Sequence, residues 1–328
     1  MRPVPVAVFA AEKSNEQSSQ SSYTIQSFVQ RNGSFMITRR DVLNLAVSAG
    51  AAAALLPAVS RAANQAGESP SFRIVDTNVS LFHWPFRRLP LDNTESLVKK
   101  YRSLGIGQVW AGSFEGVLHR DIAGVNRRLA EACLNWPELI PIGSVNPELP
   151  GWEEDLRQCC GNFSMPGIRL HPNYHGYTLD DSRFAQLLNL ATKAGCFVQI
   201  AVSMEDTRTQ HPNLVVEDVD LAPLPDLMQR VPRARVQILN DKPRGPVFER
   251  LAETTDVLFD TARVDGTDGI PKLVRSLPAG RVLFGTHAPF LIPEAALIRI
   301  HESGELDEPA LRAVYAGNAD SAFWKNGL

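Results

Sequence analysis

The segment GIRLHPNYHGYTLDDSRFAQLLNLATKAGCFVQIAVS (167–203) contains a complete strand–helix–strand unit. Its two ends, 167–172 and 196–203, are short runs of mostly apolar residues, as expected for strands that are buried on both faces. Between them, 180–195 has apolar residues three and four positions apart, opens on aspartate and closes on glycine, which predicts a capped amphipathic helix. A helix that joins two such strands favours a parallel pair.

The same alternation runs along most of the chain. Eight strand-like runs are expected, at 72–81, 107–114, 139–147, 167–172, 196–203, 235–240, 257–264 and 281–289. Amphipathic runs separate several of them, at 94–105, 121–136, 180–195 and 246–255. Right-handed crossovers close eight parallel strands into a cylinder, so the predicted fold class is α/β, a single (β/α)₈ TIM barrel. A doubly wound open sheet is the rival fold, but DTNVSLFHW (76–84) lacks the glycine-rich phosphate loop that such a sheet favours after its first strand.

The N-terminal residues predict a targeting segment instead of a folded one. Residues 1–35 are rich in Ser, Gln and Asn without periodicity, so we expect disorder, or a true start at Met36. MITRRDVLNLAVSAGAAAALLPAVSRAA (36–63) places two arginines before a mildly apolar stretch, the layout of a twin-arginine signal peptide. We place the signal at 36–62, with cleavage near Ala62, and the barrel domain at 63–328 in the periplasm. A retained membrane anchor is the alternative, although the apolar run is weak for a span of about 20 residues.

Length and charge limit the class of protein further. Removing 62 of the 328 residues leaves 266, close to the roughly 250 of one eight-fold barrel. The formal net charge is −3 and no basic stripe is present, which argues against a nucleic-acid surface. We therefore expect a small-molecule substrate and the twin-arginine export machinery as partners, with no nucleic acid, and leave a homo-oligomer open.

The four cysteines, at 133, 159, 160 and 196, form no CxxC pair and no zinc-type spacing. A disulfide between Cys133 and either Cys159 or Cys160 is one expectation in an oxidising compartment. Buried free thiols are the other.

Polar side chains occur at the end of every predicted strand, where barrels of this kind carry their functional residues. Burying each without a partner would cost about 1–3 kcal/mol, so the pattern predicts a polar pocket. The candidate catalytic residues are Arg169, His171 and His287. The candidate substrate-binding residues are Asn78, Glu115, Asn146, Tyr174, His175, Asn240 and Asp260.

The candidates suggest acid–base chemistry on an acidic substrate. Imidazoles titrate near neutrality, so His171 or His287 can move a proton. Arg169 lies two residues before His171, so both can point into the barrel, where a guanidinium would bind a carboxylate through two hydrogen bonds. The asparagines supply donors for a developing oxyanion. The structural alternatives are an ion pair of Arg169 with Glu115 or Asp260, and a His171 that is hydrogen-bonded within its own loop.

Four stretches together carry a family resemblance: IVDTNVSL (74–81), GIRLHPNYHGYTLDDSRFAQLLNLATKAG (167–195), VLFGTHAPF (282–290) and VYAGNADSAF (314–323). With them the chain resembles the amidohydrolase-related family, the branch that contains metal-dependent hydrolases, sugar-acid lactonases and decarboxylases of aromatic acids. The resemblance implies a barrel, a pocket at the carboxyl ends of the strands and usually one divalent metal.

This chain departs from the family at its metal positions. The family's His-x-His falls at Asn78 and Ser80, its next two histidines fall at Ala201 and Asn240, and its last-strand Asp falls at His287. Zinc needs at least three converging imidazole, thiolate or carboxylate ligands, so we assign no metal ligands and no confident cofactor. A zinc site rebuilt from His171, His287 and a carboxylate is the alternative.

Three hypotheses of function follow. The leading one is an amidohydrolase-related hydrolase of a small carboxylate-bearing ester, lactone or amide, with His171 or His287 as general base. The second is a carbon–carbon lyase that decarboxylates an aromatic or β-keto acid. The third is a non-catalytic protein that binds a sugar acid.

Overall fold

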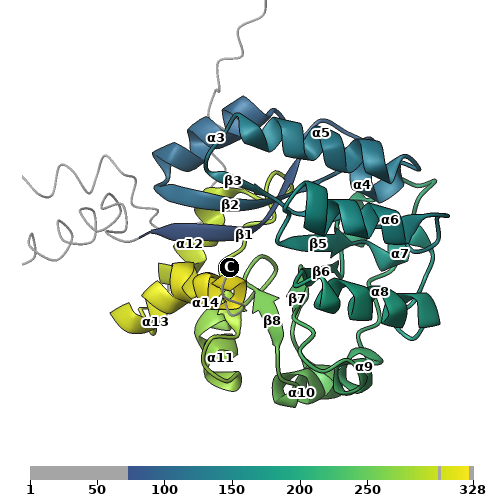
Figure 1. Ribbon diagram of the computed structural model, residues 1–328. Helices are drawn as coiled ribbons and strands as arrows, with labels where there is room; N and C mark the ends of the chain where they lie inside the picture. The colour runs from purple at the N-terminus through teal and green to yellow at the C-terminus, as the bar shows by residue number, and fades with distance from the viewer. Residues whose placement is uncertain (1–72, 302–303, 325–328) are drawn as a thin grey trace, which may run out of the picture. The chain divides into compact units, whose positions relative to one another are not determined.

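Parallel strands build the centre of the protein, whose computed structural model describes residues 73–301 and 304–324 (Figure 1). One sheet has the order β1 (Ile74–Leu81), β2 (Ile106–Ser113), β3 (Leu139–Pro141). The other has the order β4 (Gly143–Ser144), β5 (Gly167–Leu170), β6 (Phe197–Ala201), β7 (Val236–Leu239), β8 (Val257–Asp260), β9 (Val282–Leu283). The predicted disorder, signal peptide and cleavage site lie outside the described residues.

Backbone hydrogen bonds close the two sheets into one cylinder. At the first seam β3 and β4 are parts of one strand interrupted at Ile142, whose N–H donates to the Ala111 carbonyl of β2 at 2.9 Å. The second seam joins β1 to the segment after β9 through three N–H···O bonds of 2.9–3.0 Å: Thr77 to Phe284, Ser80 to Ala288 and His287 to Asn78. Each of the eight predicted strands is therefore present, and the α/β barrel prediction is confirmed. The run 139–147 is broken in two, and 281–289 forms a strand of only two residues.

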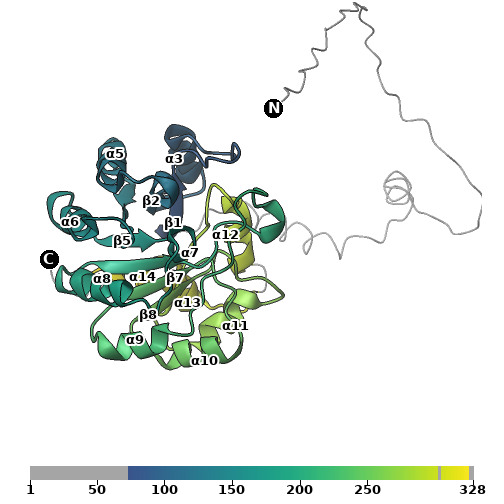
Figure 2. The ribbon, with the colours of Figure 1, turned by 90° about the vertical axis from the view of Figure 1, so that its right-hand side faces the viewer.

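Helices cover the outside of the strands (Figures 1 and 2). They are α3 (Thr94–Ser103), α4 (Glu115–Leu118), α5 (Ile122–Leu134), α6 (Trp152–Arg157), α7 (Pro172–His175), α8 (Ser182–Lys193), α9 (Leu224–Arg230), α10 (Gly245–Glu253), α11 (Gly269–Ser276), α12 (Pro293–His301), α13 (Glu308–Arg312) and α14 (Asn318–Trp324). The four predicted helices are α3, α5, α8 and α10, and the first three begin at caps, where Asn93, Asp121 and Asp181 accept backbone N–H groups. Within the described part of the chain, no helix has the length and apolar character needed to cross a membrane.

The barrel interior is apolar at the amino ends of the strands and polar toward their carboxyl ends. Trp110 of β2 and Phe197 of β6 belong to strands that are not neighbours, yet their ring centroids lie 5.0 Å apart, so they meet inside the cylinder. Farther along the strands, the Arg169 side chain crosses from β5 to β1. Its Nε donates to Gln199 Oε1 at 2.9 Å and its Nη1 to the Val79 carbonyl at 2.8 Å. Arg169 thus ties opposite walls of the barrel together.

The disulfide differs from the expectation. Cys160, in a π-helical turn at Gln158–Asn162, is bonded to Cys196 just before β6, and Cys133 and Cys159 are buried free thiols. The predicted pairing of Cys133 with Cys159 or Cys160 is therefore wrong. Cys159 packs instead toward Gly143 and Met165 in the layer between barrel and helices, where its thiol is buried.

The space for Arg169 depends on Gly112 of β2. A Cβ atom at Gly112 would lie 2.7 Å from Arg169 Nη1, whereas one at Gly107 of the same strand would have only an ordinary contact of 3.7 Å with Arg73. We therefore expect Gly112→Ala to lower the free energy of unfolding by about 1–3 kcal/mol, because the hydrogen-bonded guanidinium cannot yield. Gly107→Ala is the matched control and should change stability by less than about 0.5 kcal/mol. Urea unfolding of the full chain measures the stability of both variants. Equal losses of stability would contradict the view that Arg169 ties the barrel walls together.

Candidate active site

Three predicted residues meet at the carboxyl end of the barrel. Asn78 of β1 donates from Nδ2 to Asn240 Oδ1 at 2.7 Å and to Asp260 Oδ2 at 2.5 Å. The backbone N–H of Asn240, which directly follows β7, donates to Asp260 Oδ1 at 3.1 Å. All three residues are at most 2% exposed. The strand-end positions therefore form one hydrogen-bonded group inside the barrel.

Burial sets the protonation of Asp260. Removal from water raises its pKa to about 7, against the opposing effect of the hydrogen bonds from Asn78 and Asn240. The negative charge of Asp76 acts in the same direction as burial. Near neutral pH a large fraction of Asp260 is therefore protonated and able to donate a proton.

His171 follows β5 and is 1% exposed. Its ring lies edge-on to that of His175, with centroids 5.8 Å apart, and the Nδ1 atoms of both rings have no hydrogen-bond partner among the described residues. Burial holds the pKa of His171 well below its ordinary value, and the positive charges of His175 (when it is protonated), Arg169 and His287 (when it is protonated) act in the same direction. Burial also lowers the pKa of His175 to about 4, although its Nε2 bonds the Gly116 carbonyl at 3.0 Å. Both imidazoles are neutral at pH 7.

His287 lies on the opposite side of the same rim. Its Nε2 is 2.8 Å from the Met204 carbonyl, which makes Nε2 the protonated nitrogen, and its ring stacks on Phe290 at 5.1 Å. Burial lowers the pKa of His287 to about 3, and the charges of Arg263 and Arg169 act in the same direction. Its backbone φ is +57°, a left-handed conformation that is uncommon for a non-glycine residue.

Asp76, which was not among the predicted site residues, fixes the backbone before His287. Asp76 Oδ2 accepts hydrogen bonds from the Tyr101 hydroxyl at 2.7 Å and the Thr286 hydroxyl at 2.6 Å, and Oδ1 accepts from the Thr286 N–H at 3.0 Å. Burial raises the pKa of Asp76 to about 6. The available signal was its place on the first strand, two residues before Asn78.

Arg169 lies inside the barrel as expected, but its N–H groups bond uncharged protein acceptors. Besides Gln199 and Val79 these are Ser80 Oγ at 3.2 Å and the Trp110 carbonyl at 3.5 Å. The side chain is 2% exposed, and burial lowers its pKa to about 10, so it stays cationic at pH 7. A bidentate pair with a substrate carboxylate would require some of these bonds to break.

Two other candidates have local partners instead. Glu115, expected in the pocket, begins α4 and forms an ion pair of 2.8 Å with Arg128 of α5 in the helical layer. Asn146 Oδ1 accepts the backbone N–H of Glu148 at 3.0 Å and so stabilises a turn. Neither side chain joins the group formed by Asn78, Asn240 and Asp260.

An aromatic cap, made of Trp84, Phe86, Phe114, Tyr174 and Phe290, lies over the rim. Trp84 is its centre, with ring centroids 5.1–6.1 Å from those of the other four. Phe290 touches His287, and Tyr174 belongs to α7, directly after His171. The predicted substrate-binding residue Tyr174 is thus part of the cap.

The side chains at the family's metal positions do not fit a divalent cation. The Asn78 amide presents its N–H₂ donors to Asn240 and Asp260, and a donor group is not a metal ligand. The Nε2 of His287 is bonded to the Met204 carbonyl. Within residues 73–301 and 304–324, no three His, Cys, Asp or Glu side chains converge as a metal site. The described side chains at these positions therefore do not supply a metal site.

Several solved structures are similar to this chain over its barrel. The 5-carboxyvanillate decarboxylase of Sphingomonas paucimobilis is 13% identical, with a TM-score of 0.62 over 77% of this chain and 99% of that chain. The 2,6-dihydroxybenzoate decarboxylase of Rhizobium is 16% identical, with a TM-score of 0.58 over 77% and 100%. A dihydroxybenzoic acid decarboxylase of Polaromonas sp., solved with manganese and 2-nitroresorcinol, is 12% identical, with a TM-score of 0.58 over 78% and 98%.

At these identities the likeness establishes the fold alone. No curated protein matches the sequence. The profile of the amidohydrolase family, however, matches residues 83–323, which is most of the chain and nearly all of the barrel. The chain belongs to the amidohydrolase family.

Proposed function

We propose that this chain is a carbon–carbon lyase that removes carbon dioxide from a small aromatic or β-keto acid. The observation that carries the proposal is the buried Asp260 carboxyl, whose raised pKa of about 7 makes it a proton donor at neutral pH. The similarity to decarboxylases of hydroxylated benzoic acids supports the same reaction class.

The reaction needs one proton at the carbon that carries the carboxylate. In the proposed step on an aromatic acid, a ring electron pair takes the proton of Asp260 to form the carbon–hydrogen bond, the bond to the carboxylate breaks, and its electron pair returns to the ring as carbon dioxide leaves. With a β-keto acid the electron pair of the broken bond forms an enolate, which Asp260 then protonates at carbon. The resulting Asp260 carboxylate keeps its hydrogen bonds from Asn78 Nδ2 and the Asn240 N–H, which stabilise its charge. A proton from solvent restores the acid.

Hydrolysis of a carboxylate-bearing ester, lactone or amide is the second candidate. The observation that favours it is the neutral His171 ring, whose buried Nδ1 has no partner among the described residues and is available to accept a proton from water. In that reaction Asn78 and Asn240 would face the developing oxyanion.

Release of carbon dioxide separates these functions. We expect the full chain to release carbon dioxide from 2,6-dihydroxybenzoate, 5-carboxyvanillate or a β-keto acid, measured in the headspace together with loss of substrate. Because no step uses a metal, activity should persist after dialysis against a chelator, with less than one equivalent of metal by elemental analysis. Cleavage of lactones or esters without carbon dioxide would favour the hydrolase instead. Ligands that stabilise the protein but are recovered unchanged would favour a binding protein.

Replacement of the proposed acid tests its role. Asp260→Asn should lower kcat by about 10²–10⁴-fold, because the carbon loses its proton donor. In the unmodified protein kcat should fall as the pH rises through about 7, since Asp260 then ionises. Asp155→Asn on α6 is the matched control, because burial also raises the pKa of Asp155, to about 6, but outside the barrel. An unchanged kcat in Asp260→Asn would refute the assignment.

Burial of His287 predicts a pH-dependent stability. Its folded pKa of about 3 lies below the ordinary 6.5, so its contribution is fully present above pH 6.5 and is lost as the pH falls toward 3. This group alone adds a slope of about 1.4 kcal/mol per pH unit between pH 4 and 6. His287→Asn, which tolerates the positive φ, should remove that slope in urea unfolding curves. A curve shifted downward with an unchanged slope would contradict the neutral, buried imidazole.

A further inference from the structure

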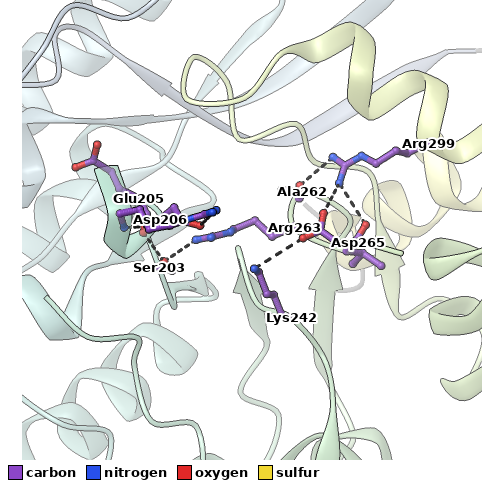
Figure 3. Close-up of polar contacts among 10 residues, drawn as sticks. Ser203, Glu205, Asp206, Lys242, Ala262, Arg263, Asp265 and Arg299 are labelled. Carbon is purple, nitrogen blue, oxygen red and sulfur yellow. Dashed lines mark hydrogen bonds and ion pairs between the residues drawn. The ribbon is translucent and has the colours of Figure 1, made fainter. Parts of the chain in front are cut away.

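A second guanidinium, that of Arg263, lies at the rim of the barrel. Arg263, in the loop after β8, is half-buried and reaches toward the loop after β6, where its Nη1 donates to Ser203 Oγ at 2.7 Å (Figure 3). Since β7 lies between β6 and β8 in the sheet, the side chain spans the carboxyl end of β7. It therefore lies on the rim that carries the candidate active site.

The acidic side chains around Arg263 are bound to other cations. Figure 3 shows Glu205, Asp206 and Asp265 in this region. Their partners are Arg87 for Glu205, Arg208 for Asp206 at 2.8 Å, and Arg299 and Lys242 for Asp265 at 3.6 and 3.8 Å. Across the described ranges, no carboxylate lies within ion-pair distance of Arg263, and its one hydrogen bond goes to a neutral hydroxyl.

Arg263 acts electrostatically on both Asp206 and His287: its charge helps to lower the pKa of Asp206, although the two form no ion pair, and it lies near His287. Ser203 precedes Met204, and the Met204 carbonyl bonds His287 Nε2 at 2.8 Å. The charge of Arg263 also contributes to the low pKa of His287, which places the two groups in one electrostatic environment. An anion bound at Arg263 would therefore lie beside the buried groups of the site.

Arg169 is less suited than Arg263 to bind the carboxylate of a ligand. It is 2% exposed and four of its hydrogen bonds go to fixed protein acceptors, whereas Arg263 makes one and is half-buried. A guanidinium has five donors in a planar fork that matches a carboxylate. Arg263 thus retains the donors needed for a two-point contact.

We propose that Arg263 binds the carboxylate of an acidic substrate at the rim, beside His287, with Ser203 holding the guanidinium in position. This substrate class deepens the proposed function and rests on it. Arg169 is then the internal brace of the barrel, and Arg263 is the residue that selects an acid over a neutral analogue.

Binding of a matched pair of probes tests the proposal. Isothermal titration calorimetry on the full chain compares 2,6-dihydroxybenzoate with its neutral amide, 2,6-dihydroxybenzamide. Loss of a charge-assisted contact should weaken benzoate binding to Arg263→Gln by about 10- to 100-fold and leave amide binding unchanged. Arg250→Gln, on helix α10 and paired with Asp226, removes the same charge away from the rim and should bind both probes as the unmodified protein does.

Two further variants keep the proposal testable if Arg263→Gln folds poorly. Arg263→Lys should retain part of the benzoate affinity, and Ser203→Ala should weaken benzoate binding only severalfold, because the charge remains. Benzoate binding that is unchanged in Arg263→Gln, or lost equally for the amide, overturns the proposal, as does an unmodified protein that binds no benzoate at millimolar concentration. Benzoate binding that depends on Arg263, without release of carbon dioxide, would refute the proposed reaction but not this assignment.

Discussion

The Arg169 guanidinium inside the barrel is the constraint to which the rest of the site is adapted. A buried cation without an ion pair is costly unless its donors are satisfied, and here Gln199 of β6 and Val79 and Ser80 of β1 supply the acceptors. These bonds fix the distance between β1, β5 and β6. The charge has a second effect, because it opposes protonation of His171 and His287 just above it. One side chain therefore both braces the cylinder and helps to keep the imidazoles neutral.

Burial has opposite effects on the pKa of the imidazoles and on that of the Asp260 carboxyl at the rim. Burial disfavours whichever form is charged, so it lowers the pKa of His287 to about 3 and raises that of Asp260 to about 7. The sequence predicted histidine as the proton carrier from its ordinary pKa near neutrality. In the folded barrel burial raises the pKa of Asp260 to about 7 and keeps His171 and His287 neutral, which is why Asp260 is the donor in the proposed reaction.

Much of the fold could be predicted from the sequence because parallel strands buried on both faces leave continuous apolar runs. The break at Ile142 could not be predicted, since it depends on which carbonyl of β2 its N–H meets. The rule that strand ends carry function placed Asn78, Asn240 and Asp260 correctly in one group. It cannot separate them from Glu115, which also follows a strand, because the ion pair with Arg128 is made by a neighbouring helix. The same rule cannot show which arginine already has hydrogen-bond acceptors for its N–H groups.

The aromatic cap and the proposed acid Asp260 lie at the same end of the barrel. Trp84 and Phe86 come from one segment after β1, whereas Phe114, Tyr174 and Phe290 follow β2, β5 and β9, and at the same end of the barrel Asp260 is only 2% exposed. Because burial is what raises the pKa of Asp260, admission of water to this carboxyl would return it toward its ordinary, ionised state. The proposed acid therefore requires that the site stays dry while a substrate is bound. In the proposed reaction the half-buried Arg263 would hold the carboxylate at the edge of the site, and the proton would come from the buried Asp260.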